Sequence, residues 1–560
     1  MNKVSCTRII AALLILSSGI SVVAQTPNSD SVSQPSASAP KIVSNAELVL
    51  VPVVVTDKSG KHIPGLTKDS FVLQEDGNPR NIGVFEEVQS TPVKPNERKQ
   101  EAGGFTNFSL DDNSPRRLLI VVLDLVNTPY LSQGRARSEL IDFLSKSLQA
   151  NEPTALLAIT NNGIVEIHPF TSNTKVLIAA LKQHNGQLTS LETTGSDGDY
   201  LTPAEQSELA AESGTIAVLE AKANALFNDF QQRNAIRITM VAMQQIAQAY
   251  ASIPGRKTLL WATSGFPFLL DDPREVGNFG TDMVYLYENA WRALNSANIA
   301  IYPISTEGVV NSVFNRQFAP SSLRGRSMGN QRMPQTDRYR LTMDTMRSFA
   351  EATGGRPCIE RNDLSKCFSE AAQDSEQYYL LGFYLGTEER KPGWRKLKVQ
   401  VNRSHVDVRA RSGFLVPSTK QAAENDVRME LTNALASPLD YTGIHMDVRW
   451  DQQNSEKGRV NAGFTIHLPA SSFTIDATHN NAVSLEILAL AFSPGGKSVA
   501  EVTKSVAGNI QPENMAQIKQ IGFTYHDVIS VPPGNYNVRV LVRDNQTGKL
   551  GTVSAPLVAE

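Results

Sequence analysis

The middle of the chain alternates between short apolar runs and helical hydrophobic patterns. Residues 118–123 are aliphatic without interruption and end at Asp124, which is typical of a central strand in a parallel sheet. Similar runs predict further strands at 155–159, 258–262, 299–302, 356–359 and 378–384. Apolar residues at helical spacing predict helices at 140–148, 176–181, 282–296, 341–353 and 363–375. The alternation predicts a doubly wound (Rossmann-type) α/β domain over 115–417, with helices on both faces of its sheet.

Two features interrupt the alternation. A three-residue loop, 161–163, links the strand at 155–159 to another at 164–167, and a loop this short cannot make a parallel crossover. We therefore expect an antiparallel hairpin at one edge of the sheet. Residues 186–252 and 308–340 are interpreted as insertions. The first contains two helical stretches, and the second is rich in Arg, which leaves open a basic binding loop or a solvated one.

A different pattern precedes the alternating region. Residues 42–90 predict a small β domain, because the run 48–55 is apolar on both faces, as in a buried strand. Asp76-Gly77 lies between two strand-like runs and favours a hairpin turn, since Gly accepts a positive φ. Residues 91–114 are polar and are predicted to be a linker.

Strand patterns return after the alternating region. Residues 394–411 alternate polar and apolar positions, and we expect this hairpin to close the α/β domain. After a helical stretch near 420–436, residues 437–560 contain short alternating strands separated by turns, which predicts an immunoglobulin-like β-sandwich. The chain is therefore expected to be a multidomain protein of the α/β plus β class.

The N-terminus has the pattern of an export signal. A short basic region precedes a mostly apolar stretch, and the small residues that end at Ala24 suit cleavage there. The apolar stretch is shorter than the ~20 residues that a membrane span needs, although an uncleaved anchor is the alternative. We expect residues 1–24 to be a signal peptide and residues 25–41 a flexible linker. The mature chain would then be periplasmic or secreted, with no membrane span.

Composition narrows the classes of function. The 560 residues suit three to four domains of about 150 residues each. A net charge of −3 gives no electrostatic reason to expect nucleic-acid binding. Three cysteines are too few for a disulfide-rich scaffold, an iron–sulfur cluster or a Cys-based zinc finger. The eight histidines form no H-E-x-x-H pair, which leaves zinc and histidine catalysis without local support.

Several motifs occur in an order that is specific for one architecture. They are V-V-V-T-D (53–57), G-L-T-K-D-S-F (65–71), E-D-G (75–77), A-T-G-G-R (352–356), Y-Y-L-L-G-F-Y (378–384) and V-R-A-R-S-G-F (408–414). With the strand that ends at Asp124 and the later Thr263-Ser264-Gly265, they resemble a von Willebrand factor A-type (VWFA) domain, and within it the acidobacterial VWFA-related branch. The resemblance covers roughly residues 45–417 of the chain. It implies an architecture and no particular reaction.

The resemblance also indicates where a metal ion would bind. Metal-binding members of the family present Asp-x-Ser-x-Ser, a Thr and a further Asp, because Mg²⁺ and other hard divalent cations require several oxygen ligands. Asp124 and Thr128 match the first and last positions of the first motif, but Val126 offers no oxygen. Ser264 stands where the further Asp is expected. The resemblance therefore implies a degenerate site, with weak binding of a divalent cation at most.

The alternative is that the same loops act without metal. Asp124 would then accept hydrogen bonds from nearby loop amides. Asn127, Thr263 and Ser264 would form a top-face loop surface, because ligands of doubly wound sheets bind beyond the carboxyl ends of the strands.

Cys358 and Cys367 are the cysteines that remain after removal of the signal peptide. Export places them in an oxidising compartment, where thiols pair. The chain turns back between the strand of Cys358 and the helix of Cys367, so a disulfide between them is expected; two buried free thiols are the alternative.

Together these patterns predict an exported, non-catalytic binding protein. The VWFA-like domain would serve protein–protein or cell-envelope interaction, and no tightly bound cofactor is expected. Metal-dependent adhesion through Asp124 and Thr128 is the first alternative, and an enzyme with an unrecognised active site is the second.

Overall fold

The structure is a computed structural model. It describes residues 47–92, 104–107, 116–146, 148, 152–184, 215–265, 281–306, 335–361, 364–386, 389, 391–416 and 424–560. The expected signal peptide (1–24), the expected linker (25–41) and the residues 186–214 and 308–334 of the two expected insertions lie outside this description. Across the described ranges, no helix has the length and apolar character needed to cross a membrane.

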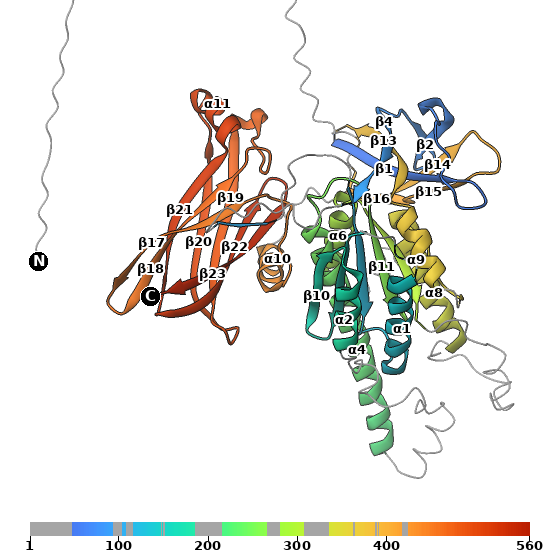
Figure 1. The fold of residues 1–560 in the computed structure, drawn as a ribbon, viewed down its shortest axis with the longest axis horizontal. Helices are drawn as coiled ribbons and strands as arrows, with labels where there is room; N and C mark the ends of the chain where they lie inside the picture. The colour runs from blue at the N-terminus through green and yellow to red at the C-terminus, as the bar shows by residue number, and fades with distance from the viewer. Residues whose placement is uncertain are drawn as a thin grey trace, which may run out of the picture. The chain divides into compact units, whose positions relative to one another are not determined.

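A five-stranded sheet lies at the centre of the α/β region (Figure 1). Its strands, in the order β10-β9-β8-β11-β12, are β10 (Gly163–Thr171), β9 (Thr154–Thr160), β8 (Leu119–Asp124), β11 (Lys257–Thr263) and β12 (Ile299–Ser305). Neighbouring strands are parallel except β10, which pairs antiparallel with β9 at the edge. The predicted edge hairpin is confirmed, and the chain order reverses between β8 and β11 as in a doubly wound sheet.

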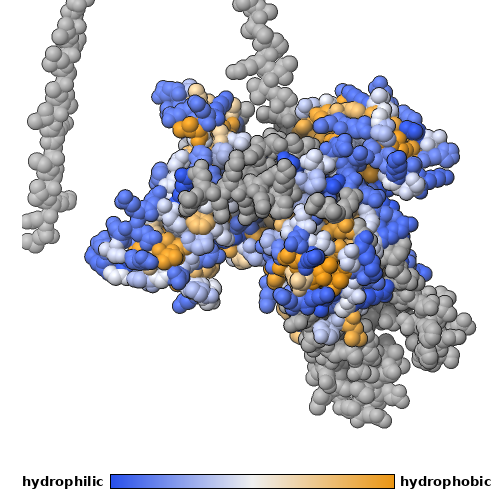
Figure 2. Space-filling model, in the orientation of Figure 1, coloured by the Kyte–Doolittle hydropathy of each residue, from blue (hydrophilic) through white to orange (hydrophobic). Residues whose placement is uncertain are grey.

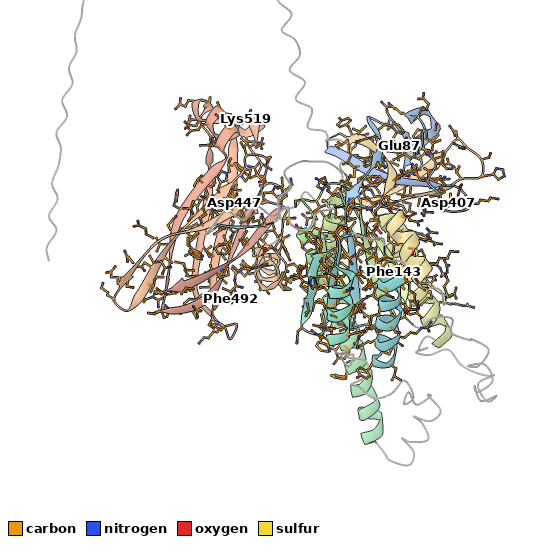
Figure 3. The ribbon with its side chains drawn as sticks, viewed as in Figure 1. Glu87, Phe143, Asp407, Asp447, Phe492 and Lys519 are labelled. Atoms are coloured by element: carbon orange, nitrogen blue, oxygen red, sulfur yellow. A yellow bond between two sulfur atoms is a disulfide. The ribbon has the colours of Figure 1, made fainter. Side chains whose placement is uncertain are left out.

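Helices cover both faces of this sheet, as the alternation predicts. They are α1 (Tyr130–Lys146), α2 (Thr174–Gln183) and α9 (Leu364–Gln373) on one face, and α4 (Thr215–Ala249), α6 (Thr281–Ser296) and α8 (Gln335–Thr353) on the other. Successive side chains of a strand point to opposite faces, so Val121 of β8 belongs to the first core and Val122 to the second. In the first core, Phe143 of α1 (Figure 3) packs on Phe368 of α9, with ring centroids 4.7 Å apart.

One expected insertion is part of the core. Residues 186–252 were expected to contain two separate helical stretches, but 215–249 form the single helix α4. Its Ile236, Met243 and Ile246 are fully buried against the sheet. The expectation of two helices was wrong because the composition changes near residue 228 without a helix end there. The sequence pattern therefore changes along one continuous helix.

The N-terminal strands do not form a domain of their own. β1 (Glu47–Thr56) pairs antiparallel with β13 (Gln377–Leu385) and β15 (Asp407–Ala410), and β4 (Val84–Gln89) pairs with the other edge of β13. A second sheet has the order β16-β14-β2-β3; its strands are β16 (Gly413–Val416), β14 (Gly393–Val401), β2 (Phe71–Glu75) and β3 (Asn78–Arg80). Figure 2 shows apolar surface over β1, β4 and β13, where Leu48 and Tyr384 are exposed.

This pairing corrects two expectations. The strand at 378–384 was assigned to the doubly wound sheet, and 394–411 was expected to close that domain; both instead complete the sheets of the N-terminal strands. The buried faces of the two sheets share one apolar core, which includes Val53, Leu73 and Tyr379. A strand buried on both faces has the same apolar pattern whichever partner it takes. The sequence therefore predicted the strands and missed the pairing.

The expected linker at 91–114 contains two short strands, and a third strand follows it at 116–117. β5 (Thr91–Pro92) pairs with β7 (Arg116–Arg117), and β6 (Gly104–Thr106) joins the C-terminal sandwich beside β17. The fully buried Asn107 fixes β6 there, because its side-chain amide donates to the carbonyl oxygens of Tyr441 (2.7 Å) and Ile444 (2.6 Å). Part of this segment is therefore structural.

The C-terminal region is a sandwich of two antiparallel sheets, β21-β18-β17-β6 and β20-β19-β22-β23. The strands are β17 (Asp447–Glu456), β18 (Arg459–Leu468), β19 (Ala482–Phe492), β20 (Ser498–Asn509), β21 (Phe523–Val531), β22 (Gly534–Asp544) and β23 (Leu550–Ala559). The helices are α10 (Glu424–Ala436), α11 (Pro512–Ile521) and the short η4 (Ala477–His479); a similar η1 (Lys68–Ser70) precedes β2. Alternate residues such as Phe464, Ile487 and Val540 fill one core between the sheets.

A buried carboxyl group sits at the amino edge of the central sheet. Glu152 precedes β9 and contacts Arg117, with 2.8 Å between Oε2 and Nε; Nη1 of Arg117 lies 2.9 Å from Oε1 of Glu376. Burial raises the pKa of Glu152 from 4.5 to about 7, although the charge of Arg117 opposes the rise. The folded protein therefore holds this proton at pH values where the unfolded chain releases it. The stabilisation that comes from the protonated form is lost as the pH rises from about 4.5 to about 7.

We expect Glu152→Gln to remove that pH dependence. Relative to the wild-type protein, the variant should gain stability as the pH rises through this window, by up to about 3 kcal/mol above pH 7. Urea unfolding of both proteins at a series of pH values between 4 and 8 measures the difference. A difference that stays constant over this range would contradict the assignment.

Candidate functional site

The candidate site is at the carboxyl edge of the central sheet, where β8 ends at Asp124. This residue is 1% exposed and is followed by a tight loop that leads into α1. Oδ1 accepts hydrogen bonds from the backbone amides of Val126 (3.2 Å) and Asn127 (2.9 Å). The loop therefore folds back on the carboxylate at the end of its own strand.

The second oxygen of Asp124 joins the loop after β8 to β11. Oδ2 accepts from the side-chain amide of Asn127 (2.8 Å), the indole nitrogen of Trp261 (3.1 Å) and the hydroxyl of Thr263 (2.8 Å). The Asn127 amide also donates to the hydroxyl of Thr239 on α4 (2.9 Å). Burial raises the pKa of Asp124, and the hydrogen bonds that it accepts from Asn127, Thr263 and Trp261 oppose that rise.

The remaining loop residues bond to one another. The Thr128 hydroxyl accepts from the backbone amide of Ser264 (3.2 Å), and the Ser264 hydroxyl lies 2.8 Å from the hydroxyl of Thr306, which follows β12. Gln133 of α1 donates to the carbonyl oxygen of Thr128 (2.8 Å). The loops after β8, β11 and β12 are therefore joined by protein–protein hydrogen bonds.

The structure places the residues predicted from the sequence in two neighbouring groups of contacts. Asn127 and Thr263 contact Asp124 directly, whereas Thr128 and Ser264 contact each other. Both carboxylate oxygens already face N–H and O–H donors, whose hydrogens would oppose an approaching cation. Within the described ranges, no group of three or more His, Cys, Asp or Glu side chains is placed to hold a metal ion.

Sequence reasoning missed two members of the site. Trp261 lies two residues before Thr263 on β11, so the period of a strand places both side chains on the face that reaches Asp124. The two-residue period of the strand is thus the signal in the sequence that places Trp261 at the site. Thr239 lies in the middle of α4, and its hydroxyl also donates to the Ala235 carbonyl (2.9 Å). No local pattern distinguishes it from an ordinary helical threonine.

Two apolar side chains are exposed next to this loop. Tyr130 and Leu131 begin α1, two and three residues after Thr128, and are 49% and 87% exposed. The first turn of a helix that leaves the carboxyl edge of a doubly wound sheet is where ligands of such folds bind. An exposed leucine is unremarkable when isolated, but here it adjoins the loop network.

The predicted cysteine pair is joined in the structure. The Cα atoms of Cys358 and Cys367 are 6.0 Å apart in a disulfide. Cys358 does not lie in a strand of four residues as expected; it makes a single parallel bridge to Ile304 of β12, and its amide donates to the Pro303 carbonyl (2.8 Å). The bond therefore fastens α9 to the edge strand of the central sheet.

We expect reduction of this disulfide to lower the free energy of unfolding by about 2–3 kcal/mol, as chain entropy gives for a short loop. Both cysteines are buried, so the bond should resist reductant in the folded protein and yield in denaturant. Peptide mapping without reductant checks the pairing, and urea unfolding of a Cys358→Ala/Cys367→Ala variant gives the energy. Two alkylatable thiols in protein purified under oxidising conditions would show that the pairing is wrong.

Comparison with known proteins adds little to this geometry. No protein-family model matches the chain, and no curated protein matches it. Among solved structures, the chain is similar to one described as "Crystal Structure of the TFIIH p34 N-terminal Domain", with 16% identity over 34% of this chain and 79% of that one. The TM-score is 0.16, too low to support an argument about fold or function.

Proposed function

We propose that this is an exported, non-catalytic binding protein whose VWFA-like α/β domain binds a protein or cell-envelope partner at the carboxyl edge of its central sheet. The observation that carries the proposal is the hydrogen-bonding of Asp124. Five protein donors occupy its two oxygens. The loops that bind a metal ion in metal-binding VWFA domains are thus held in place here by the chain itself, which leaves a prearranged surface for a partner.

The same observation separates this proposal from its rivals. Catalysis by Asp124 would require an oxygen that can take or give a proton, and both are engaged with fixed donors. Metal-dependent adhesion would require those donors to turn away. The disulfide between Cys358 and Cys367 supports export, because such bonds persist in oxidising compartments. A periplasmic or secreted location is part of the proposal.

We expect Mg²⁺ to bind the unmodified protein only at millimolar concentrations or above. Val126 supplies no side-chain oxygen, and the Thr128 hydroxyl is used by the Ser264 amide. A Val126→Ser/Ser264→Asp variant, which adds a hydroxyl at one position and a carboxylate at the other, should bind Mg²⁺ more tightly. Calorimetric titration of both proteins with Mg²⁺, Mn²⁺ and Ca²⁺ measures this. Micromolar binding by the unmodified protein would instead favour metal-dependent adhesion.

A site-specific crosslink tests the binding surface. A photoreactive amino acid at Leu131 should give a discrete adduct in an envelope extract of the source cells. The same amino acid at Ile521, which is 54% exposed at the end of α11, serves as the control. The partner, identified by mass and purified, should bind the Leu131→Glu variant at least about tenfold more weakly than the wild type. Identical adducts from both positions, or unchanged affinity of the variant, would refute this surface.

A further inference from the structure

A second candidate site lies away from the Asp124 loops. It is a cavity of about 440 Å³, within the roughly 300–1,000 Å³ range of small-molecule sites. The cavity lies between α6, α8 and the sheet that contains β2 and β14. Its lining combines the aromatic residues Tyr287, Trp291 and Trp394 with a set of polar side chains. These are Gln74, Ser348, Glu351, Lys396, Lys398 and Ser412.

The aromatic wall is held in one arrangement. Trp291 of α6 packs against Trp394 of β14 with ring centroids 5.6 Å apart, and Tyr287 packs on Trp291 at 6.2 Å. The indole of Trp394 lies directly over Gly413, where a Cβ would come within 2.6 Å of its Nε1 and Cε2 atoms. The glycine of the S-G-F motif is therefore needed to seat this ring. Because Trp291 and Tyr287 are buried and Trp394 is only partly so, Trp394 offers the cavity its aromatic surface.

The polar side of the cavity is formed by residues that alternate along β14, because every second side chain of a strand points to the same face. Trp394, Lys396 and Lys398 alternate along β14 and thus share one face of it, whereas Leu397 between them is buried in the core of the other face. Gln74 of β2 is the cross-strand partner of Lys398. One face of the sheet therefore places the indole and two lysines of β14 and the amide of Gln74 on β2 around the same cavity.

One buried polar atom in the wall has no partner within the protein. Trp291 is 1% exposed, and its indole nitrogen makes no hydrogen bond with another described group. A buried N–H without an acceptor costs free energy, so such groups in native proteins call for a specific explanation. The nitrogen is closed to solvent, so it marks an unsatisfied polar group in the cavity wall and is not itself a contact point for a ligand.

From these features we infer that the cavity is a binding site for a saccharide that contains an acidic sugar. A sugar ring has an apolar C–H face, which packs on an indole, and a rim of hydroxyl groups, which pair with amides and hydroxyls. The two lysines outnumber the single carboxylate of Glu351, which favours a ligand that itself carries a carboxylate. This inference goes beyond the proposed function, because it uses neither Asp124 nor the loops around it.

A proline-rich peptide is the main competing ligand for an aromatic groove. Such peptides dock on apolar ridges and need few polar partners. Six of the side chains that line this cavity are polar or charged, so the chemistry of the lining favours the saccharide. The peptide is included in the test as an outcome that would overturn the inference.

Calorimetric titration of the full mature chain tests the inference. The ligands are oligogalacturonides, neutral cello- and malto-oligosaccharides and a proline-rich peptide. We expect the acidic oligosaccharide to bind with at least millimolar affinity and to change the tryptophan fluorescence. Lys398→Glu should weaken this binding by about tenfold or more, since it reverses a charge in the cavity. Trp394→Phe, which keeps an aromatic ring over Gly413, should weaken it less, and thermal melting confirms that each variant is folded.

Two controls separate this site from other effects. Lys519→Glu makes the same charge change on α11 (Figure 3), outside the cavity, and should leave binding unchanged. Leu131→Glu, which impairs the proposed partner surface, should also leave it unchanged, so the two proposals can fail separately. Absence of binding by every saccharide at millimolar concentration would overturn the inference. So would equal losses in Lys398→Glu and Lys519→Glu, or binding of the peptide alone.

Discussion

Replacing Asp124 with alanine is expected to lower the free energy of unfolding by about 3–5 kcal/mol. The change leaves the amides of Val126 and Asn127, the indole N–H of Trp261 and the hydroxyl of Thr263 without their acceptor in a buried setting. A buried donor that loses its partner incurs the full cost of desolvation, and several do so at once here. Urea unfolding with linear extrapolation measures the loss.

Asp142 provides the matched control for this experiment. It lies on the exposed face of the adjacent helix α1 and pairs with Lys146 in an i,i+4 ion pair at 2.7 Å. Such surface pairs contribute little, so Asp142→Ala should change stability by less than about 0.5 kcal/mol. If added Mg²⁺ restored the stability that Asp124→Ala loses, or if both variants were equally stable, the structural role given to Asp124 would be wrong.

Gly355→Ala is expected to destabilise the protein by about 3 kcal/mol or more. A Cβ at this position would lie 2.0 Å from the carbonyl oxygen of Ile301 in β12 and 2.8 Å from its carbonyl carbon. Both atoms belong to the backbone of a buried strand, so relief would require the strand to move. The A-T-G-G-R motif thus has a physical basis in the close approach of the chain after α8 to the central sheet.

Gly134→Ala is the matched control for a glycine substitution. Gly134 lies in α1, and a Cβ there meets no atom within 4 Å. Alanine favours the helix, so this variant should gain about 0.5–1 kcal/mol. Thermal or urea unfolding of both variants compares them directly. A Gly355→Ala protein as stable as the wild type would show that the chain after α8 lies further from β12.

The positions of the strands could be predicted from the sequence more accurately than the pairing between them. The aliphatic run 118–123 predicts a strand buried on both faces, and it forms most of the central strand β8 (Leu119–Asp124). The run at 378–384 is also largely apolar, and it was assigned to the same sheet. It pairs instead with β1, which precedes it by most of the length of the α/β region. The pattern of apolar residues shows which strands are buried. It does not show which strand pairs with which.

Prediction of the candidate site from the sequence was incomplete for a similar reason, because some of its side chains come together only through packing. Asp124 and Thr263 were expected at the carboxyl edge because they lie at the ends of strands, and Asn127 because it lies in the loop after Asp124; the structure brings the three into contact. Thr239 reaches the site from the interior of α4, so its role depends on how that helix packs. The cavity beside Trp394 depends on the pairing of β2 with β14 and on the seating of the indole over Gly413. A single sequence contains neither kind of information.

The pairing of β1 with β13 also sets the order in which the molecule can fold. β1 is synthesised early, yet both of its neighbours, β13 and β15, are made only after the whole central sheet. Until then its Val51, Val53 and Val55, which are fully buried in the finished fold, have no partner strand and form an edge prone to aggregation. Contacts this distant along the chain form slowly. The N-terminal strands are therefore expected to complete folding last, and a chaperone that holds the nascent chain would act on this segment first.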